Sequence, residues 1–90
     1  SKLIYLKKLN LALNQLEVIS FDHIQLSNLR ELNLSRNQID IFPDKIHQWT
    51  SLTILDLSFN KLSSIPRYAL MGLNNLTWLS LASNRNLNCT

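Results

Sequence analysis

The residues that could carry out catalytic chemistry are few and scattered along the chain. Its 90 residues include one cysteine, Cys89, two histidines, His23 and His47, and six carboxylates. None of these residues lies at the spacing of a nucleophile–base pair or a metal-binding motif, and no glycine-rich phosphate loop occurs. We therefore expect no catalytic residue, no metal site and no cofactor in this segment, while a catalytic domain outside these residues remains an alternative.

Three asparagines lie in the sequon Asn-X-Ser/Thr, which accepts N-linked glycans in secreted proteins. They are Asn33, Asn75 and Asn88. Asn33 falls within a predicted strand, where a glycan would block the surrounding surface. Asn75 falls in the turn before a predicted strand, and it is therefore the better candidate for glycosylation.

The spacing of 20 leucines and 11 asparagines predicts the elements that position these residues. Four segments share the pattern L-x-x-L-x-L-x-x-N-x-L, with one extra residue in the last: LKKLNLALNQLEVI, LRELNLSRNQIDIF, LTILDLSFNKLSSI and LTWLSLASNRNL. They begin at Leu6, Leu29, Leu52 and Leu76, which are 23, 23 and 24 residues apart. The Leu-x-Leu unit has a period of two, so it favours a short strand over an amphipathic helix.

This pattern resembles the leucine-rich repeat family over essentially the whole chain. The resemblance implies an α/β fold, a right-handed solenoid with short parallel strands on its concave face and mostly irregular or 3-10 returning segments. Pro43 and Pro66, which follow inward apolar residues, agree with irregular returns. We expect a single array over 1–90 that is a slice of a longer protein: 1–5 ends a preceding repeat, 6–28, 29–51 and 52–75 are repeats, and 76–90 runs into a candidate C-terminal cap.

The apolar and amide positions of the pattern have structural explanations. The two leucines of each Leu-x-Leu unit should point into a common core, and Trp49 should occupy a position in that core that is leucine in other repeats. The asparagine that follows each strand can both donate and accept hydrogen bonds, so it can satisfy backbone groups that the sheet does not reach. We predict that these residues form a structural ladder rather than a ligand site: Asn14, Asn37, Asn60 and Asn84.

Side chains between the inward leucines should face the concave surface, because strand side chains alternate. One column across the repeats reads Lys8, Glu31, Ile54, Trp78, and its neighbour reads Asn10, Asn33, Asp56, Ser80. Two large apolar side chains together on a polar face are typical of a contact surface. We predict a protein-binding patch of Ile54, Phe59 and Trp78, edged by Arg36, Asp56 and Lys61. The alternative is that Trp78 only covers its neighbours and that Phe59, in L-S-F-N, is a frequent variant of the family at this position.

Two repeats indicate different subclasses of the family. Residues 65–76, IPRYALMGLNNL, resemble an extracellular 24-residue repeat, whereas residues 42–52, FPDKIHQWTSL, resemble a 23-residue repeat common in cytosolic scaffolds. Residues 84–89, NRNLNC, resemble the opening of the cysteine-bearing cap of extracellular arrays, with Arg85 in place of the usual proline. Cys89 is therefore a candidate for a disulfide, and a free or buried thiol is the alternative.

The resemblance implies a protein-recognition module that binds a protein ligand or co-receptor. We favour the ectodomain of a secreted or cell-surface receptor or adhesion protein, with a cytosolic scaffold or regulatory array of a signalling protein as the alternative. The net charge of +3 is spread along the chain and does not predict a nucleic-acid surface. No apolar run is long enough for a membrane helix, so we expect no direct membrane contact. Uncapped apolar ends would allow homo-oligomers to form.

Overall fold

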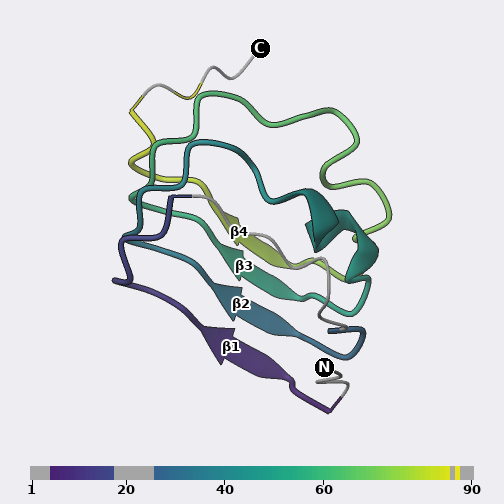
Figure 1. Cartoon of the computed structure of the whole chain (residues 1–90). Helices are drawn as coiled ribbons and strands as arrows, with labels where there is room; N and C mark the ends of the chain where they lie inside the picture. Colours follow the sequence, from purple (N-terminus) through teal and green to yellow (C-terminus); the bar gives the residue numbers. More distant parts are fainter. Residues whose placement is uncertain (1–4, 18–25, 86, 88–90) are drawn as a thin grey trace.

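Four short strands form one parallel sheet in the computed structural model, which describes residues 5–17, 26–85 and 87. The strands are β1 (Lys8–Asn10), β2 (Glu31–Asn33), β3 (Ile54–Asp56) and β4 (Trp78–Ser80), and they follow one another across the sheet in chain order (Figure 1). Leu9 pairs with Leu32, Leu32 with Leu55, and Leu55 with Leu79, so the sheet keeps the register of the repeats. The prediction of short parallel strands is confirmed.

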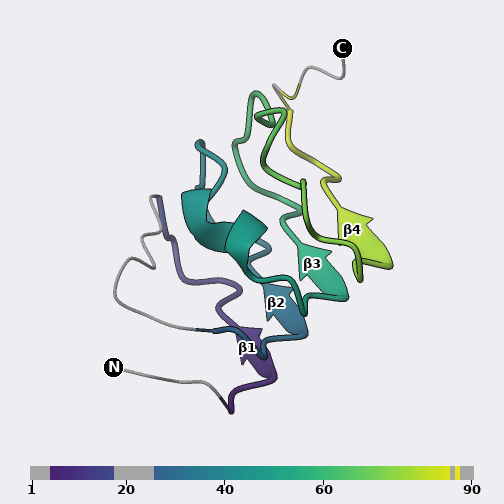
Figure 2. The same cartoon turned by 90° about the vertical axis from the view of Figure 1, so that its right-hand side faces the viewer.

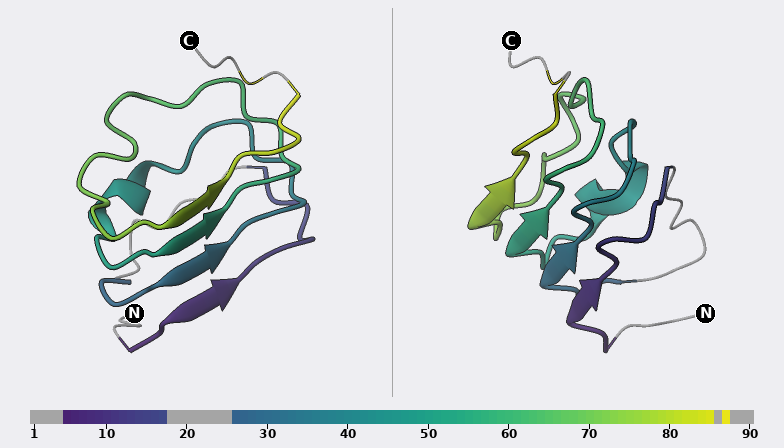
Figure 3. Two further views of the ribbon diagram at one scale, coloured as in Figure 1. Left: turned by 180° about the vertical axis from the view of Figure 1, so that it is seen from behind. Right: turned by 90° about the vertical axis from the view of Figure 1, so that its left-hand side faces the viewer.

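The described returning segments, in the repeats of β2 and β3, lie opposite the strands, as Figures 2 and 3 show. In the described part of the chain the only helix is the 3-10 helix η1 (Asp44–Gln48), which begins after Pro43 in extended backbone (ψ 127°). In the next repeat the chain returns through successive turns, in which Ala69 N–H donates to the Pro66 carbonyl at 3.0 Å. The prediction of irregular or 3-10 returns is therefore confirmed.

The core lies between the sheet and the returning segments. The leucine in the middle of β2 and of β3 is almost fully buried, as are the leucines three residues before it and two residues after it, and Trp49 joins them with 4% of its surface exposed, as predicted. The buried residues of the two central repeats include Leu29, Leu32, Leu34, Leu52, Leu55 and Leu57. The corresponding leucines of the outer repeats, such as Leu9 and Leu79, are only partly buried. Each repeat thus depends on neighbours on both sides to cover its apolar layer.

Hydrogen bonds between repeats continue past the ends of the strands. Leu34 N–H donates to the Asp56 carbonyl at 2.8 Å, and Leu57 N–H donates to the Ser80 carbonyl at 2.9 Å. Before the strands, Thr53 donates both its N–H and its hydroxyl to the Arg30 carbonyl, at 2.8 and 3.0 Å. Hydrogen bonds between repeats therefore hold the backbone of the sheet both before and after the strands.

Candidate functional site

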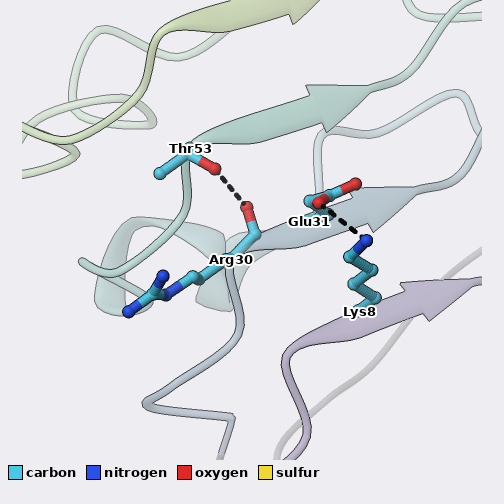
Figure 4. Close-up of polar contacts among 4 residues, drawn as sticks. All are labelled: Lys8, Arg30, Glu31 and Thr53. Carbon is cyan, nitrogen blue, oxygen red and sulfur yellow. Dashed lines mark hydrogen bonds and ion pairs between the residues drawn. The ribbon is translucent and has the colours of Figure 1, made fainter.

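The exposed side of the sheet contains a hollow of about 240 Å³. It is lined by outward side chains of all four strands, among them Asn33, Ile54, Asp56 and Trp78. At one end of the hollow, Lys8 Nζ lies 3.4 Å from Glu31 Oε2, an ion pair between adjacent strands (Figure 4). The Lys8 side chain is well exposed and that of Glu31 is partly exposed, so the pair contributes at most about 1 kcal/mol to stability. Its main effect on the surface is to neutralise both charges.

The second column of outward residues also fixes the turn after each strand. Asn10, Asn33 and Asp56 each accept, at Oδ1, the backbone N–H of the residue two positions later, at 3.0 Å. In the two central repeats the serine at that later position is buried, and its hydroxyl donates to the same oxygen, at 2.7 Å for Ser35 and 2.6 Å for Ser58. In these two repeats the serine therefore both fits the buried position and fastens the turn through its hydroxyl.

The next residue in each repeat has left-handed backbone geometry. Leu13, Arg36, Phe59 and Ser83 have φ between 57° and 63°, a conformation that costs a residue with a side chain about 1–3 kcal/mol. The φ values are nearly the same in all four repeats, so the bend belongs to the repeat and not to one side chain. The bend also presents Arg36 and Phe59 to solvent, where the guanidinium carbon lies 4.1 Å from the ring centroid.

The asparagine that follows the bend ties its repeat to the preceding one. Asn37 Oδ1 accepts the N–H groups of Asn14 and Leu16 at 2.9 and 3.0 Å, and Asn37 Nδ2 donates to the Leu11 carbonyl at 3.0 Å. Asn60 and Asn84 repeat this arrangement, accepting from Ile39 N–H and Leu62 N–H respectively at 3.0 Å. These buried amides satisfy backbone groups of two repeats at once, which makes them part of the scaffold beneath the exposed surface.

Comparison with protein families identifies this scaffold. A family model described as leucine-rich repeat matches residues 40–85, slightly more than half of the chain, and a second leucine-rich repeat model matches residues 28–49. The chain belongs to the leucine-rich repeat family. No significant match to a curated protein or to a solved structure was found. Leucine-rich repeats generally mediate protein–protein interaction and are typically non-enzymatic.

The residues predicted to form the binding patch fall into separate groups on this leucine-rich repeat sheet. Ile54, Asp56 and Trp78 line the hollow, where Ile54 pairs with Trp78 across β3 and β4. Phe59 and Arg36 contact each other at the bend after the strands. The sequence pattern placed all of them on one face, but it contained no signal for the left-handed bend that separates the two groups. The remaining predicted residue, Lys61, is exposed beyond that bend.

The predicted modification sites also have distinct positions in the leucine-rich repeats. Asn33 lies in the hollow, and its Oδ1 is occupied by the two bonds from Ser35. Asn75 is exposed at the turn before β4, and its Nδ2 donates to the Thr50 carbonyl of the adjacent repeat at 3.0 Å. Asn88 and Cys89, the other candidates, lie outside the described residues.

The described histidine and carboxylate side chains of the leucine-rich repeats do not gather into a metal site. Among the side chains that the structure describes, no three of His, Cys, Asp and Glu lie close enough together to hold a metal ion. His47 lies on the returning side, where its ring meets that of Tyr68 edge to face, with centroids 6.0 Å apart. His23 lies outside the described residues. Within the described ranges there is also no helix with the length and hydropathy required to cross a membrane.

Proposed function

We propose that the exposed side of the sheet binds a protein ligand or co-receptor, as part of a secreted or cell-surface receptor or adhesion ectodomain. The observation that carries the binding proposal is Trp78, whose side chain is 49% exposed next to Ile54 in a hollow that is otherwise largely polar. Tryptophan is enriched among residues that dominate binding energy at protein interfaces. An exposed tryptophan on a fixed backbone is therefore a suitable anchor for a partner.

The rigidity of the sheet supports this proposal. Backbone bonds join the repeats before, within and after the strands, and the buried asparagines fix the turns below. A surface that is already ordered loses little conformational entropy when a partner binds. Affinity then depends on the side chains that the sheet presents.

Site-specific crosslinking in the natural cells tests the location of the binding surface. We expect a discrete protein adduct when Trp78 is replaced by the photo-crosslinker p-benzoylphenylalanine, because a partner bound in the hollow contacts this position. The matched control places the same residue at Tyr68, which is also aromatic and exposed but lies on the returning side. Equal adducts from both positions, or adducts from position 68 alone, would contradict the proposal.

The extracellular setting is supported by the sequence of residues 65–76, which is similar to an extracellular repeat subtype, and by the cap-like residues 84–89. Asn75 is exposed, and attachment of a glycan to its Nδ2 leaves one N–H, which can keep the bond to Thr50. The second candidate is a cytosolic scaffold or regulatory array, which is favoured by residues 42–52 and their similarity to a 23-residue cytosolic subtype.

Mass spectrometry of the protein from its natural source distinguishes these two settings. We expect a glycan on Asn75 and an oxidised Cys89, because both modifications form in the secretory pathway. Peptide mapping before and after enzymatic removal of N-glycans measures the first, and differential thiol alkylation measures the second. Unmodified Asn75 and Asn88 together with a reduced Cys89 would favour the cytosolic alternative.

A further inference from the structure

The hollow carries one negative charge that the described residues do not neutralise. Lys8 and Glu31 pair with each other, and Arg36 is stacked on Phe59 at the bend. Among the side chains that the structure describes, no lysine or arginine nitrogen lies within 4.0 Å of the carboxylate of Asp56. Lys8 belongs to β1, two strands away from Asp56, a separation of about 9–10 Å. Asp56 therefore gives this part of the hollow its charge.

Only one oxygen of Asp56 has a bonding partner within the described ranges. Oδ1 accepts the N–H of Ser58 at 3.0 Å and its hydroxyl at 2.6 Å. These bonds hold the carboxylate in a fixed orientation at the end of β3. The second oxygen can then accept hydrogen bonds from a ligand without a change in the turn.

An apolar surface lies next to this carboxylate. Ile54 precedes Asp56 by two residues on the same face of β3, and Trp78 is the cross-strand partner of Ile54. Trp78 is thus the diagonal neighbour of Asp56, at a separation of about 7–8 Å that long side chains can span. A cation with an aliphatic stem matches this arrangement, because the stem can pack on Ile54 and the indole while the charged end reaches Asp56.

We infer that the hollow binds a lysine or arginine side chain from an extended segment of the protein partner, with Asp56 pairing its charge and with Ile54 and Trp78 packing its stem. This inference rests on the proposed protein-binding function of the hollow. An acidic partner residue would be repelled by Asp56. An apolar one would cover the carboxylate without replacing its water, which costs free energy. A basic residue is favoured both by the carboxylate of Asp56 and by the apolar surface of Ile54 and Trp78.

The test uses Asp56→Asn, a substitution that removes the charge and keeps the turn. Asn33 occupies the same position in β2 and makes the same two bonds, to Ser35 N–H at 3.0 Å and to its hydroxyl at 2.7 Å. The probe is a phage-displayed library of random dodecapeptides, selected in parallel on the full protein and on Asp56→Asn. We expect lysine and arginine to be enriched above their library frequency on the native protein and not on the variant.

A synthetic peptide from the selection gives the quantitative measurement. Replacing its arginine by citrulline, which is neutral and of the same shape, should weaken binding to the native protein about tenfold. The two peptides should bind Asp56→Asn equally well, since the charge they differ by has lost its partner. Glu31→Gln is the matched control: it removes the carboxylate that is already paired with Lys8, and the preference for arginine should persist.

The outcomes separate this inference from the proposed function. Selected peptides without basic residues, whose binding is nevertheless lost in Trp78→Ala, would overturn the basic preference and leave the binding surface intact. A preference that survives Asp56→Asn or disappears in Glu31→Gln would also overturn the inference. If no peptide is selected, or if the selected peptides bind Trp78→Ala as well as the native protein, both the inference and the proposed surface are wrong.

Discussion

Replacing Asn60 by alanine should lower the free energy of unfolding by roughly 3–4 kcal/mol, because buried polar backbone groups left without partners cost about 1–3 kcal/mol each. The Asn60 side chain is 6% exposed, accepts Ile39 N–H at 3.0 Å, and donates to the carbonyls of Leu34 and Leu57 at 3.0 Å. Alanine makes none of these bonds, so the N–H of Ile39 and the carbonyls of Leu34 and Leu57 lose their side-chain partner. Urea unfolding followed by circular dichroism measures the change.

Asn14→Ala is the matched control for this prediction. Asn14 has the same position in its repeat, but its side chain is exposed, and within the described ranges it donates to Ala12 O alone, at 3.1 Å. We expect a loss of no more than about 1 kcal/mol, the value of a single exposed hydrogen bond. Equal losses for Asn14→Ala and Asn60→Ala would show that the bonds between repeats contribute nothing beyond those within a repeat.

A second large effect is expected for Leu55→Ala, which should lower the free energy of unfolding by about 3–5 kcal/mol. Leu55 is fully buried in β3, between Leu32 on one side and Leu79 on the other. Truncation to alanine removes apolar contacts and leaves a cavity that the paired strands on both sides keep open. The same urea titration measures this effect, as a shift of the midpoint at unchanged slope.

Leu79→Ala tests whether the loss of stability in Leu55→Ala depends on the repeats that flank Leu55. Leu79 holds the same position in β4 but is only partly buried, so its truncation should cost roughly 1–2 kcal/mol. The ratio of the two losses then measures how much a neighbouring repeat adds to the core. If Leu79→Ala were as harmful as Leu55→Ala, stacking on both sides would not be the source of the stability of Leu55.

The fold could be predicted from the sequence because the same pattern of leucines recurs in each repeat. A single L-x-L would fit a strand or one side of a helix, but four copies at 23 or 24 residues require Leu9, Leu32, Leu55 and Leu79 to lie in one layer. The returning segments could be predicted only in kind. Pro43 excludes a helix interior, yet it does not determine that η1 forms after it while the segment after Pro66 remains a series of turns.

The candidate site was predictable in its membership and less so in its geometry. Strand alternation places Ile54, Asp56 and Trp78 on one face, and they line the hollow. The left-handed backbone at Phe59 and the two bonds from Ser58 to Asp56 were not predicted. Both depend on local backbone geometry, which the residue types at these positions permit but do not specify, since leucine, arginine, phenylalanine and serine all occupy the same bend.

The direction of the ladder bonds has a consequence for synthesis on the ribosome. The N–H groups of Asn14 and Leu16 are accepted by the side chain of Asn37, which is translated 23 and 21 residues later. At 5–20 residues per second, each new turn waits about one to five seconds for the amide that completes it. During that interval its donors are open to water or to a chaperone. During synthesis, the hydrogen bonds of each repeat are therefore completed only when the following repeat has been translated.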